Sequence, residues 1–103
     1  MKKRIPVIAI FDIGKTNKKL LIFDTDYNVL KEEVTCFNEI TDDDGFACEN
    51  IDALAAWILL EFEQLKRSEE FQLRAVNFST YGASLVYVNH HGDRVGYLYN
   101  YLK

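Results

Sequence analysis

Residues 5–24 have the sequence IPVIAIFDIGKTNKKLLIFD, and this stretch decides the fold that we expect. Its first part, residues 5–11, is a continuous β-branched apolar run, which is typical of a strand covered on both faces. A polar turn with one glycine follows at 12–17, and the apolar residues 20–23 then predict a second strand. Two such strands joined by a short polar loop predict a β-hairpin.

The residues after this hairpin predict a third strand and one helix. Residues 24–28 have the composition of a turn, because Asx side chains bond their own backbone, and residues 29–37 predict a strand with one solvated face. A loop at 41–45 precedes Asn50, which is a favourable N-cap for a helix over 51–67. The apolar residues of this helix follow helical spacing, so it is the most strongly patterned element.

Two apolar stripes run along the expected helix. The larger stripe should face the sheet and comprises Ile51, Leu54, Ala55, Ile58, Leu59, Phe62 and Leu65. The smaller stripe lies nearly opposite and comprises Ala53, Trp57 and Leu60. One sheet and one helix do not need a second stripe, so we expect further chain or a partner to cover it, with Trp57 as a packing residue.

The last part of the chain predicts three more strands. The expected segments are a strand at 73–78, a polar break at 79–84, a strand at 85–88, a turn at 89–93 and a strand at 95–102. The order is therefore βββαβ followed by a hairpin, which is typical of the start of an RNase H-like α/β domain. Because the sequence ends within an aromatic-rich stretch, with no further helix for the second sheet face, we expect residues 1–103 to be a truncated half-domain.

The composition indicates one small globular domain. The chain has 103 residues, of which 49% are hydrophobic and 14% aromatic, and this is too apolar for a disordered tail. A formal net charge of -4 argues against a general nucleic-acid-binding protein, which needs a basic face. Half of the acidic residues, 8 of 16, lie between Glu32 and Asp52, and we expect them to form a solvated loop and strand face.

The sequence points to a cytoplasmic protein. The first apolar run is interrupted at Asp12 and has no small-residue cleavage site after it, unlike a signal peptide. No stretch approaches the roughly 20 apolar residues of a membrane span. Cys36 and Cys48 have neither CxxC nor metal-ligand spacing, so we expect two free, buried thiols in a reducing compartment.

The turn between the first two strands carries the residues best suited to chemistry. Gly14-Lys15-Thr16 resembles the end of a P-loop, but Ala9 stands where that motif needs a glycine, and a strand follows instead of a helix. A hairpin turn can still hold phosphate, because glycine permits close backbone approach while N–H groups, hydroxyls and cations supply contacts. The candidate phosphate-binding residues are Gly14, Lys15, Thr16, Asn17 and Lys19, with Asp12 facing Mg2+ through a water.

Residues 11–24 resemble the opening of the FGGY carbohydrate kinases. The first hairpin of that family has the pattern D-x-G-T/S-T/S-x-x-K/R, followed by an apolar strand that ends near an Asp. The positions that match are Asp12, Gly14, Thr16, Lys19 and Asp24. Lys15 departs from the pattern, since a small hydroxyl residue is more usual there.

Residues 75–88 resemble the strand-turn-strand segment that reaches the sugar in this family. The resemblance is closest to the rhamnulokinase-like branch, whose turn has roughly the pattern D-T-W-G-V-D. The residues that match T-W-G in kind, and would bind the sugar, are Thr80, Tyr81 and Gly82. Ser79 and Ser84 replace the two acids. From the residues alone, Tyr81 could equally stack on a sugar ring or fill the core at a strand end.

The resemblance implies phosphate transfer from ATP, with Mg2+, to a hydroxyl of a sugar such as a deoxyhexulose or another ketose. It covers nearly all of this chain but only the first part of a family member. It places the general base, an Asp, downstream of Lys103 and the adenosine site in a C-terminal kinase domain that is absent here. We therefore expect the isolated chain to be inactive and to self-associate through exposed apolar surface, with no nucleic-acid or membrane partner.

Two other functions remain open. The chain could be a stand-alone nucleotide- or sugar-binding module, or an assembly module that pairs through the smaller helical stripe. Calcium binding at Asp24–Asn28 is disfavoured, because Val29 replaces the glycine that an EF-hand loop needs. His90 and His91 have no third ligand nearby in sequence, so we expect surface histidines in a turn.

Overall fold

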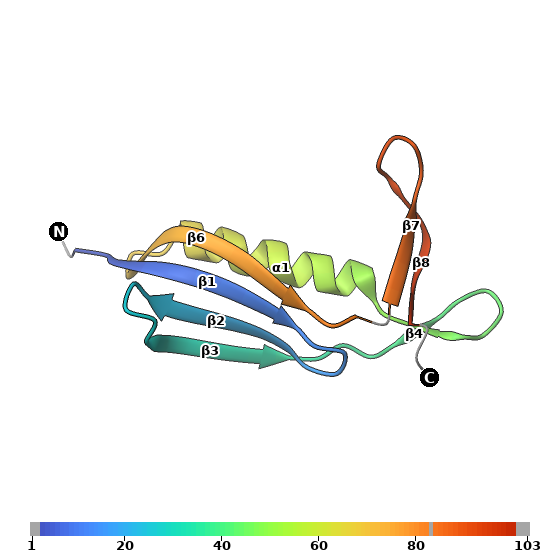
Figure 1. Cartoon of the computed structure of the whole chain (residues 1–103), viewed down its shortest axis with the longest axis horizontal. Coiled ribbons are helices and arrows are strands. Elements are labelled where there is room, and N and C mark those ends of the chain that lie inside the picture. Colours follow the sequence, from blue (N-terminus) through green and yellow to red (C-terminus); the bar gives the residue numbers. More distant parts are fainter. Residues whose placement is uncertain (1–2, 83, 101–103) are drawn as a thin grey trace.

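The computed structural model describes residues 3–82 and 84–100 and has a mixed α/β fold (Figure 1). The elements in chain order are β1 (Ile5–Ile13), β2 (Lys18–Asp24), β3 (Val29–Thr35), β4 (Ile40–Thr41), β5 (Ala47–Cys48), α1 (Ile51–Lys66), β6 (Phe71–Thr80), β7 (Ser84–Val88) and β8 (Arg94–Asn100). The predicted order of three strands, a helix, a strand and a final hairpin is confirmed. The short strands β4 and β5 were not predicted.

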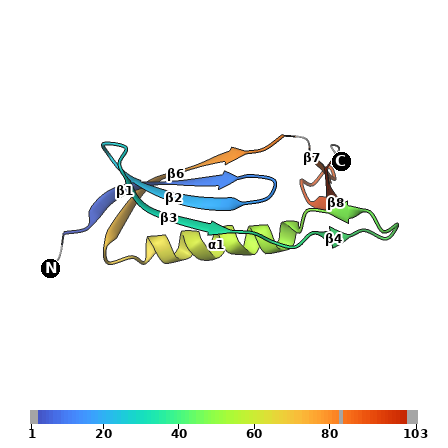
Figure 2. The ribbon, with the colours of Figure 1, turned by 90° about the horizontal axis from the view of Figure 1, so that it is seen from below.

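Four strands form the main sheet, in the order β3-β2-β1-β6 (Figure 1, Figure 2). β1 pairs antiparallel with β2, and β2 pairs antiparallel with β3. β6 pairs parallel with β1, and α1 forms the crossover between them. β1 is therefore a central strand, and its carboxyl end lies beside the carboxyl end of β6.

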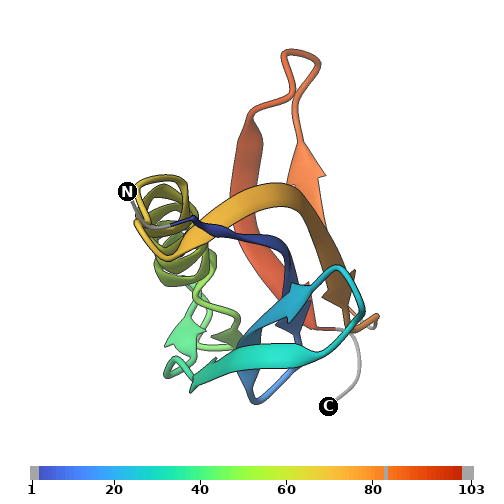
Figure 3. The same cartoon turned by 90° about the vertical axis from the view of Figure 1, so that its left-hand side faces the viewer.

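The core lies between the main sheet and α1. Along β1, alternate side chains from Val7 to Ile13 are buried on the side that faces the helix. The ring of Phe11 meets that of Trp57 edge to face, at 5.6 Å between centroids, and stacks on that of Phe78 at 5.4 Å. These contacts hold the helix against one face of the sheet. Figure 3 shows α1 on one side of the strands.

The second face of the main sheet is less buried than the sequence predicts for residues 5–11. Ile8 and Ile10 of β1 point to this face and are only half-buried. Among the described residues, α1 is the single helix, and it packs against the first face. The continuous apolar run of β1 therefore does not correspond to a strand covered on both faces here.

β1 extends two residues beyond its apolar run, and this changes the position of Asp12. The sequence predicts Asp12 and Ile13 in the turn, but both are strand residues that pair with Lys19 and Lys18 of β2. β6 pairs with the same two residues on the other edge. Ladder bonds on both edges satisfy the backbone and lengthen the strand, so the connecting loop is reduced to residues 14–17.

Helix α1 spans nearly the predicted residues but faces the sheet with a different side. Asn50 caps it as predicted, with its Oδ1 accepting a 3.1 Å hydrogen bond from the Ala53 N–H. Leu59, predicted to face the sheet, is 62% exposed, whereas Trp57, predicted on the opposite side, packs against the core. The large indole contacts Phe11, and this contact sets the rotation of the helix. No helix in the described part of the chain is long and apolar enough to cross a membrane.

The turn at 24–28 forms by the predicted Asx chemistry, and the turns that begin at Asp42 and Asn89 have the same pattern. Asp24 Oδ1 accepts hydrogen bonds from the backbone N–H groups two and four residues further along the chain, and Asn89 Oδ1 does the same. The Asn89 turn joins β7 to β8, and both of its histidines are exposed. The predicted last strand corresponds to β8, and residues 101–103 lie outside the described residues.

Two further predictions about burial are wrong, and both concern the segment 36–49. Cys36 is exposed just after the edge strand β3, whereas Cys48 is buried as predicted. Glu49 belongs to the acidic stretch predicted to be solvated, yet it is only 5% exposed. β4 and β5 pair as a small hairpin in this segment, and two-residue strands have too little periodicity to be recognised in a sequence.

Candidate functional site

The two sequence segments predicted to bind ligands lie at the same end of the main sheet. The hairpin loop 14–17 follows β1, and the turn 80–82 begins at the last residue of β6. The backbone N–H of Tyr81 donates a 2.9 Å hydrogen bond to the carbonyl of Ile13, which joins the two strand ends directly. Segments far apart in the sequence are thus neighbours where the parallel strands end, as Figure 1 shows.

The hairpin loop depends on glycine at position 14. The Gly14 N–H donates a 3.0 Å hydrogen bond to the Asn17 carbonyl and closes the loop. A Cβ atom at position 14 would lie 2.7 Å from that carbonyl oxygen, closer than real Cβ contacts. Lys15, Thr16 and Asn17 are exposed around the closed loop. The loop therefore presents a compact run of backbone and polar groups to the solvent.

Asp12 and Lys19 share the sheet face that points away from α1. The two residues are register partners across β1 and β2, and Ser79 is the partner of Asp12 on β6. Cross-strand partners project on the same side of a sheet, so one carboxylate, one ammonium and one hydroxyl lie in a row. Asp12 and Lys19 are both half-buried. The structure thus brings together the predicted carboxylate and one predicted phosphate-binding lysine.

The predicted sugar-binding residues begin on the opposite side of the sheet. Thr80 is the register partner of Ile13, whose side chain is buried on the helix side. Tyr81 is half-buried, and its hydroxyl donates a 3.2 Å hydrogen bond to Oε2 of Glu49. A Cβ at Gly82 would meet no heavy atom within 4 Å, so this position is open. The two predicted segments are adjacent, but Asp12 and Thr80 project from different faces.

A cavity of about 300 Å3 lies beside Tyr81, between the sheet end, α1 and β8. Its polar lining comes from Glu49, Thr80, Tyr81 and Ser84, and its remaining lining is apolar: Ile13, Leu54, Ile58, Phe78 and Leu98. Burial raises the pKa of the Tyr81 hydroxyl, and the negative charge of Glu49 raises it further. Tyr81 is therefore a hydrogen-bonded cavity residue, rather than a fully buried core residue.

Lys18 and Glu49 are site residues that the sequence analysis did not identify. Lys18 is 1% exposed, and its Nζ lies 2.5 Å from Oε1 of Glu49. The same ammonium donates a 2.9 Å hydrogen bond to the carbonyl of Lys15 in the hairpin loop. The signal for Lys18 was strand alternation, because it shares a side with the buried Leu20. Glu49 has no comparable signal, since it follows a two-residue strand.

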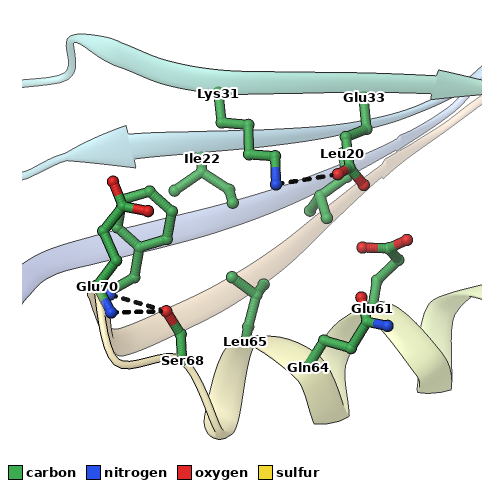
Figure 4. A pocket seen from close by; sticks show the side chains of 10 residues that line it. Leu20, Ile22, Lys31, Glu33, Glu61, Gln64, Leu65, Ser68 and Glu70 are labelled. Carbon is green, nitrogen blue, oxygen red and sulfur yellow. Dashed lines mark hydrogen bonds and ion pairs between the residues drawn. The ribbon is translucent and has the colours of Figure 1, made fainter.

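A smaller cavity of about 130 Å3 lies at the other end of the molecule, between β2, β3 and the last turns of α1 (Figure 4). Lys31 and Glu33, two residues apart on β3, form an ion pair of 3.1 Å along one side of the cavity (Figure 4). Burial raises the pKa of the Glu61 carboxyl, and a hydrogen bond with Glu33 raises it further. None of the residues predicted from the sequence to bind ligands lines this cavity.

Comparisons with known proteins point to a sugar-kinase fold. No protein-family model matches the chain, and no curated protein matches it in sequence. Among solved structures, the chain is similar to the crystal structure of gluconate kinase from Lactobacillus acidophilus, with a TM-score of 0.73 at 16% sequence identity. The match covers 91% of this chain and 19% of that kinase, so the chain spans about a fifth of its length. The described residues therefore have the fold of part of a sugar kinase.

Proposed function

We propose that this chain is the N-terminal part of an ATP-dependent carbohydrate kinase of the FGGY type, with an RNase H-like half-domain. The observation that carries the proposal is the hydrogen bond from the Tyr81 N–H to the Ile13 carbonyl, which sets the hairpin loop beside the turn after β6. Ligands of open α/β sheets bind outside the carboxyl ends of parallel strands. The similarity to part of gluconate kinase supports the same assignment of fold.

The hairpin is the proposed site for the ATP phosphates. Gly14 keeps the loop tight, so that its backbone N–H groups can approach a phosphate, and Lys19 supplies a positive charge nearby. Bound Mg2+ would offset the negative charge of the phosphates. Asp12, which lies on the same sheet face as Lys19, would hold this ion through a water. This agrees with the preference of Mg2+ for one or two carboxylates plus phosphate and water.

The turn after β6 is the proposed site for the sugar. The hydroxyls of Thr80 and Tyr81 line the cavity beside the strand end and can exchange hydrogen bonds with sugar hydroxyls. The open position of Gly82 leaves room for a ligand to approach the backbone. The sequence of this turn resembles the rhamnulokinase-like branch, which favours a deoxyhexulose or another ketose as the substrate. Gluconate is the alternative that the solved kinase suggests.

The chain alone is proposed to bind weakly and to transfer no phosphate. The resemblance assigns the general base and the adenosine contacts to sequence beyond residue 103, and this chain spans 19% of the solved kinase. With only the phosphate half of a nucleotide site, the affinity for Mg-ATP should lie in the millimolar range. A kinase also needs domain closure to exclude water from the reacting phosphate.

A stand-alone binding module is the second candidate function. The cavity beside Tyr81 favours it, because residues of this chain alone line a space of about 300 Å3 with four polar side chains. Such a module would bind its ligand without a second domain, and micromolar affinity would then be expected. An assembly role has less support, because Trp57 of the smaller helical stripe packs against the core.

Titration with Mg-ATP, followed by amide NMR of the labelled chain, tests the proposed nucleotide site. We expect shift changes at residues 14–17 and Lys19, with a dissociation constant on the order of 1 mM. Asp12→Asn should weaken binding of Mg-ATP about five-fold but should not weaken the binding of Mg-free ATP, because Asp12 is proposed to act through the cation and its carboxylate repels the free polyanion.

Lys31→Met provides the matched control. Lys31 lies on β3 beside the distant small cavity, so this variant removes one positive charge without altering the hairpin. Non-specific electrostatic binding of the anionic ligand would instead weaken in Lys31→Met and strengthen in Asp12→Asn, because the first variant loses a positive charge and the second a negative charge. That result, or shift changes away from residues 14–19, would reject the proposed site. Micromolar affinity would favour the stand-alone binding module instead.

A further inference from the structure

A buried charged pair lies between the two proposed ligand-binding segments. Lys18 is 1% exposed and Glu49 is 5% exposed, and their charged atoms are 2.5 Å apart. Burying two charges costs free energy that the ion pair only partly recovers, and apolar residues of similar size often serve stability equally well. The pair is therefore weak evidence for a role in stability alone. Its position suggests that it specifies the arrangement of its neighbours.

Each partner of the pair contacts one of the two segments. The Lys18 ammonium donates a 2.9 Å hydrogen bond to the Lys15 carbonyl, which lies inside the hairpin loop. The second oxygen of Glu49 accepts a 3.2 Å hydrogen bond from the Tyr81 hydroxyl, which belongs to the turn after β6. In the described residues no buried side-chain nitrogen or oxygen lacks a partner, so each buried polar atom of this network has at least one. A continuous polar path thus runs from the loop to the turn.

We propose that Lys18, Glu49 and Tyr81 form a positioning bridge that couples the hairpin loop to the turn after β6. The bridge rests on the proposed function only for the identity of what the two segments bind. A shift of the Tyr81 ring, such as a ligand in the adjacent cavity would cause, changes the hydrogen bond to Glu49. Glu49 in turn holds the ammonium that fixes the Lys15 carbonyl. A change at the turn is therefore transmitted to the hairpin loop through these side chains.

Polar coupling of this kind is strongest where solvent is excluded. Lys18 and Glu49 are almost completely buried, so water cannot replace either contact without local opening. The Lys15 carbonyl lies between Gly14 and Asn17, whose backbone hydrogen bond closes the loop. The closing bond is the reporter of the bridge, because it lies beside the Lys18 contact. The Tyr81 N–H also donates to the Ile13 carbonyl, which belongs to the same peptide group as the Gly14 N–H, so the effect of Tyr81→Phe is measured in Lys18→Met as well, where the bridge predicts no further change at the Gly14 amide.

Tyr81→Phe in the ligand-free chain tests the bridge. The variant removes one hydroxyl at the turn. The measured quantity is the hydrogen-exchange rate of the Gly14 amide in the hairpin, and the exchange rate of the Ala9 amide in the centre of β1 serves as the reference. We expect the Gly14 amide to exchange about ten-fold faster and to change its chemical shift, because one hydrogen bond to a charged group is lost. Unchanged exchange and an unchanged shift of the Gly14 amide would overturn the proposal.

Glu49→Gln and Lys18→Met extend the test to the charged pair. Each should accelerate exchange of the Gly14 and Tyr81 amides together, whereas Glu33→Gln, which breaks the exposed Lys31–Glu33 pair, should affect neither. Lys18→Arg keeps the charge and should restore most of the protection. Acceleration of only one of the two amides would also overturn the coupling. These measurements use no ligand, so failure to bind Mg-ATP would reject the proposed function without affecting the bridge.

Discussion

Tyr27 adopts a backbone conformation that its side chain disfavours. Its φ is 66°, in the left-handed region, and its side chain is 78% exposed, so little packing offsets the strain. We predict that Tyr27→Gly raises the free energy of unfolding by about 0.5 to 1 kcal/mol, as measured by urea denaturation. Tyr27→Ala is the control, because it removes the ring but keeps the Cβ. A gain of equal size in the alanine variant would mean that the ring, rather than the backbone, is responsible.

Gly14 should be intolerant of any side chain. A Cβ there would approach the Asn17 carbonyl oxygen to 2.7 Å and would open the bond that closes the hairpin. We predict that Gly14→Ala lowers the free energy of unfolding by about 1 to 3 kcal/mol and increases amide exchange in residues 15–18. Gly82→Ala, where a Cβ meets nothing within 4 Å, should have little effect. Equal stability of the two variants would contradict this geometry.

At the level of single residues, the sequence predicts the polar residues that follow a known spacing and misses the buried charged ones. Asp12, Gly14 and Lys19 follow a recognisable spacing, and the structure places them at one end of the sheet. Lys18 and Glu49 were missed, because a charged residue is expected on the surface unless its partner is known. That partner is 31 positions away in the sequence, and only the packing of the segment before α1 brings the two together.

Helix α1 and strand β3 bring two carboxylates close together at the small cavity. Burial and a hydrogen bond with Glu33 raise the pKa of Glu61 above its ordinary value of 4.5, so the folded chain holds this proton more tightly than the unfolded chain. The free energy of unfolding must therefore fall as the pH rises through the raised pKa. We predict that Glu61→Gln stabilises the chain at pH 7 by a few tenths to about 1 kcal/mol, and that the gain vanishes below about pH 4.

Glu63, on the same helix, has a pKa that is shifted in the opposite direction. Its side chain forms a 2.9 Å ion pair with Lys66, and a hydrogen bond from Lys66 lowers the pKa of Glu63. The stabilisation is present at neutral pH and is lost as the pH falls through the lowered pKa. Glu63→Gln should therefore be neutral or slightly destabilising at pH 7. A stabilising effect in both variants would indicate a general benefit of lower negative charge, rather than the Glu61–Glu33 contact.

Elements with a strong periodic pattern were predictable from the sequence. The short strands, and the ends of strands that are extended by pairing with their neighbours, were not. Helix α1 and the strands of both long hairpins lie within two or three residues of their predicted bounds. The ends of β1 were missed, because pairing with two neighbours extends a strand beyond its apolar residues. The rotation of α1 about its axis was also missed. The seven apolar residues of the larger stripe cover more of the helix surface than the part that touches the sheet, and only packing decides that Trp57, rather than Leu59, faces the core.

The uncovered face of the main sheet is the dominant feature of the whole molecule. It carries half-buried apolar residues such as Ile8, Ile10 and Phe23, and the exposed Val29 lies on β3 beside Phe23. We predict concentration-dependent self-association and binding of a hydrophobic dye. Val29→Lys should reduce both, because a charged residue on an edge strand disfavours contact between sheets.

Leu59→Lys serves as the control for this surface. Leu59 is 62% exposed on the outer side of α1, so the variant adds the same charge away from the sheet. Sedimentation at several concentrations should show weaker association for Val29→Lys than for Leu59→Lys. A wild-type chain that stays monomeric and does not bind the dye would contradict the prediction.

The order of elements was predictable at the scale of the whole molecule, but the arrangement of the site was not. The βββαβ order agrees with the parallel pairing of β6 and β1 across a crossover helix, although the sequence did not specify β1 as the partner. The sequence could not show that Asp12 and Thr80 project from opposite faces, since this depends on where β1 ends. The sequence therefore predicts the two segments of the site, but it does not show that their side chains project from different faces of the sheet.

The measurement that tests the central claim most directly is amide shift mapping of the labelled chain with two ligands, each added separately. Mg-ATP should shift the amides of residues 14–17, and a deoxyhexulose or gluconate should shift those of residues 80–82, at concentrations up to about 10 mM. Shifts in both segments, which the hydrogen bond between Tyr81 and Ile13 joins, would support one kinase site at the end of the sheet. Shifts confined to other surfaces, or none in either segment, would contradict it.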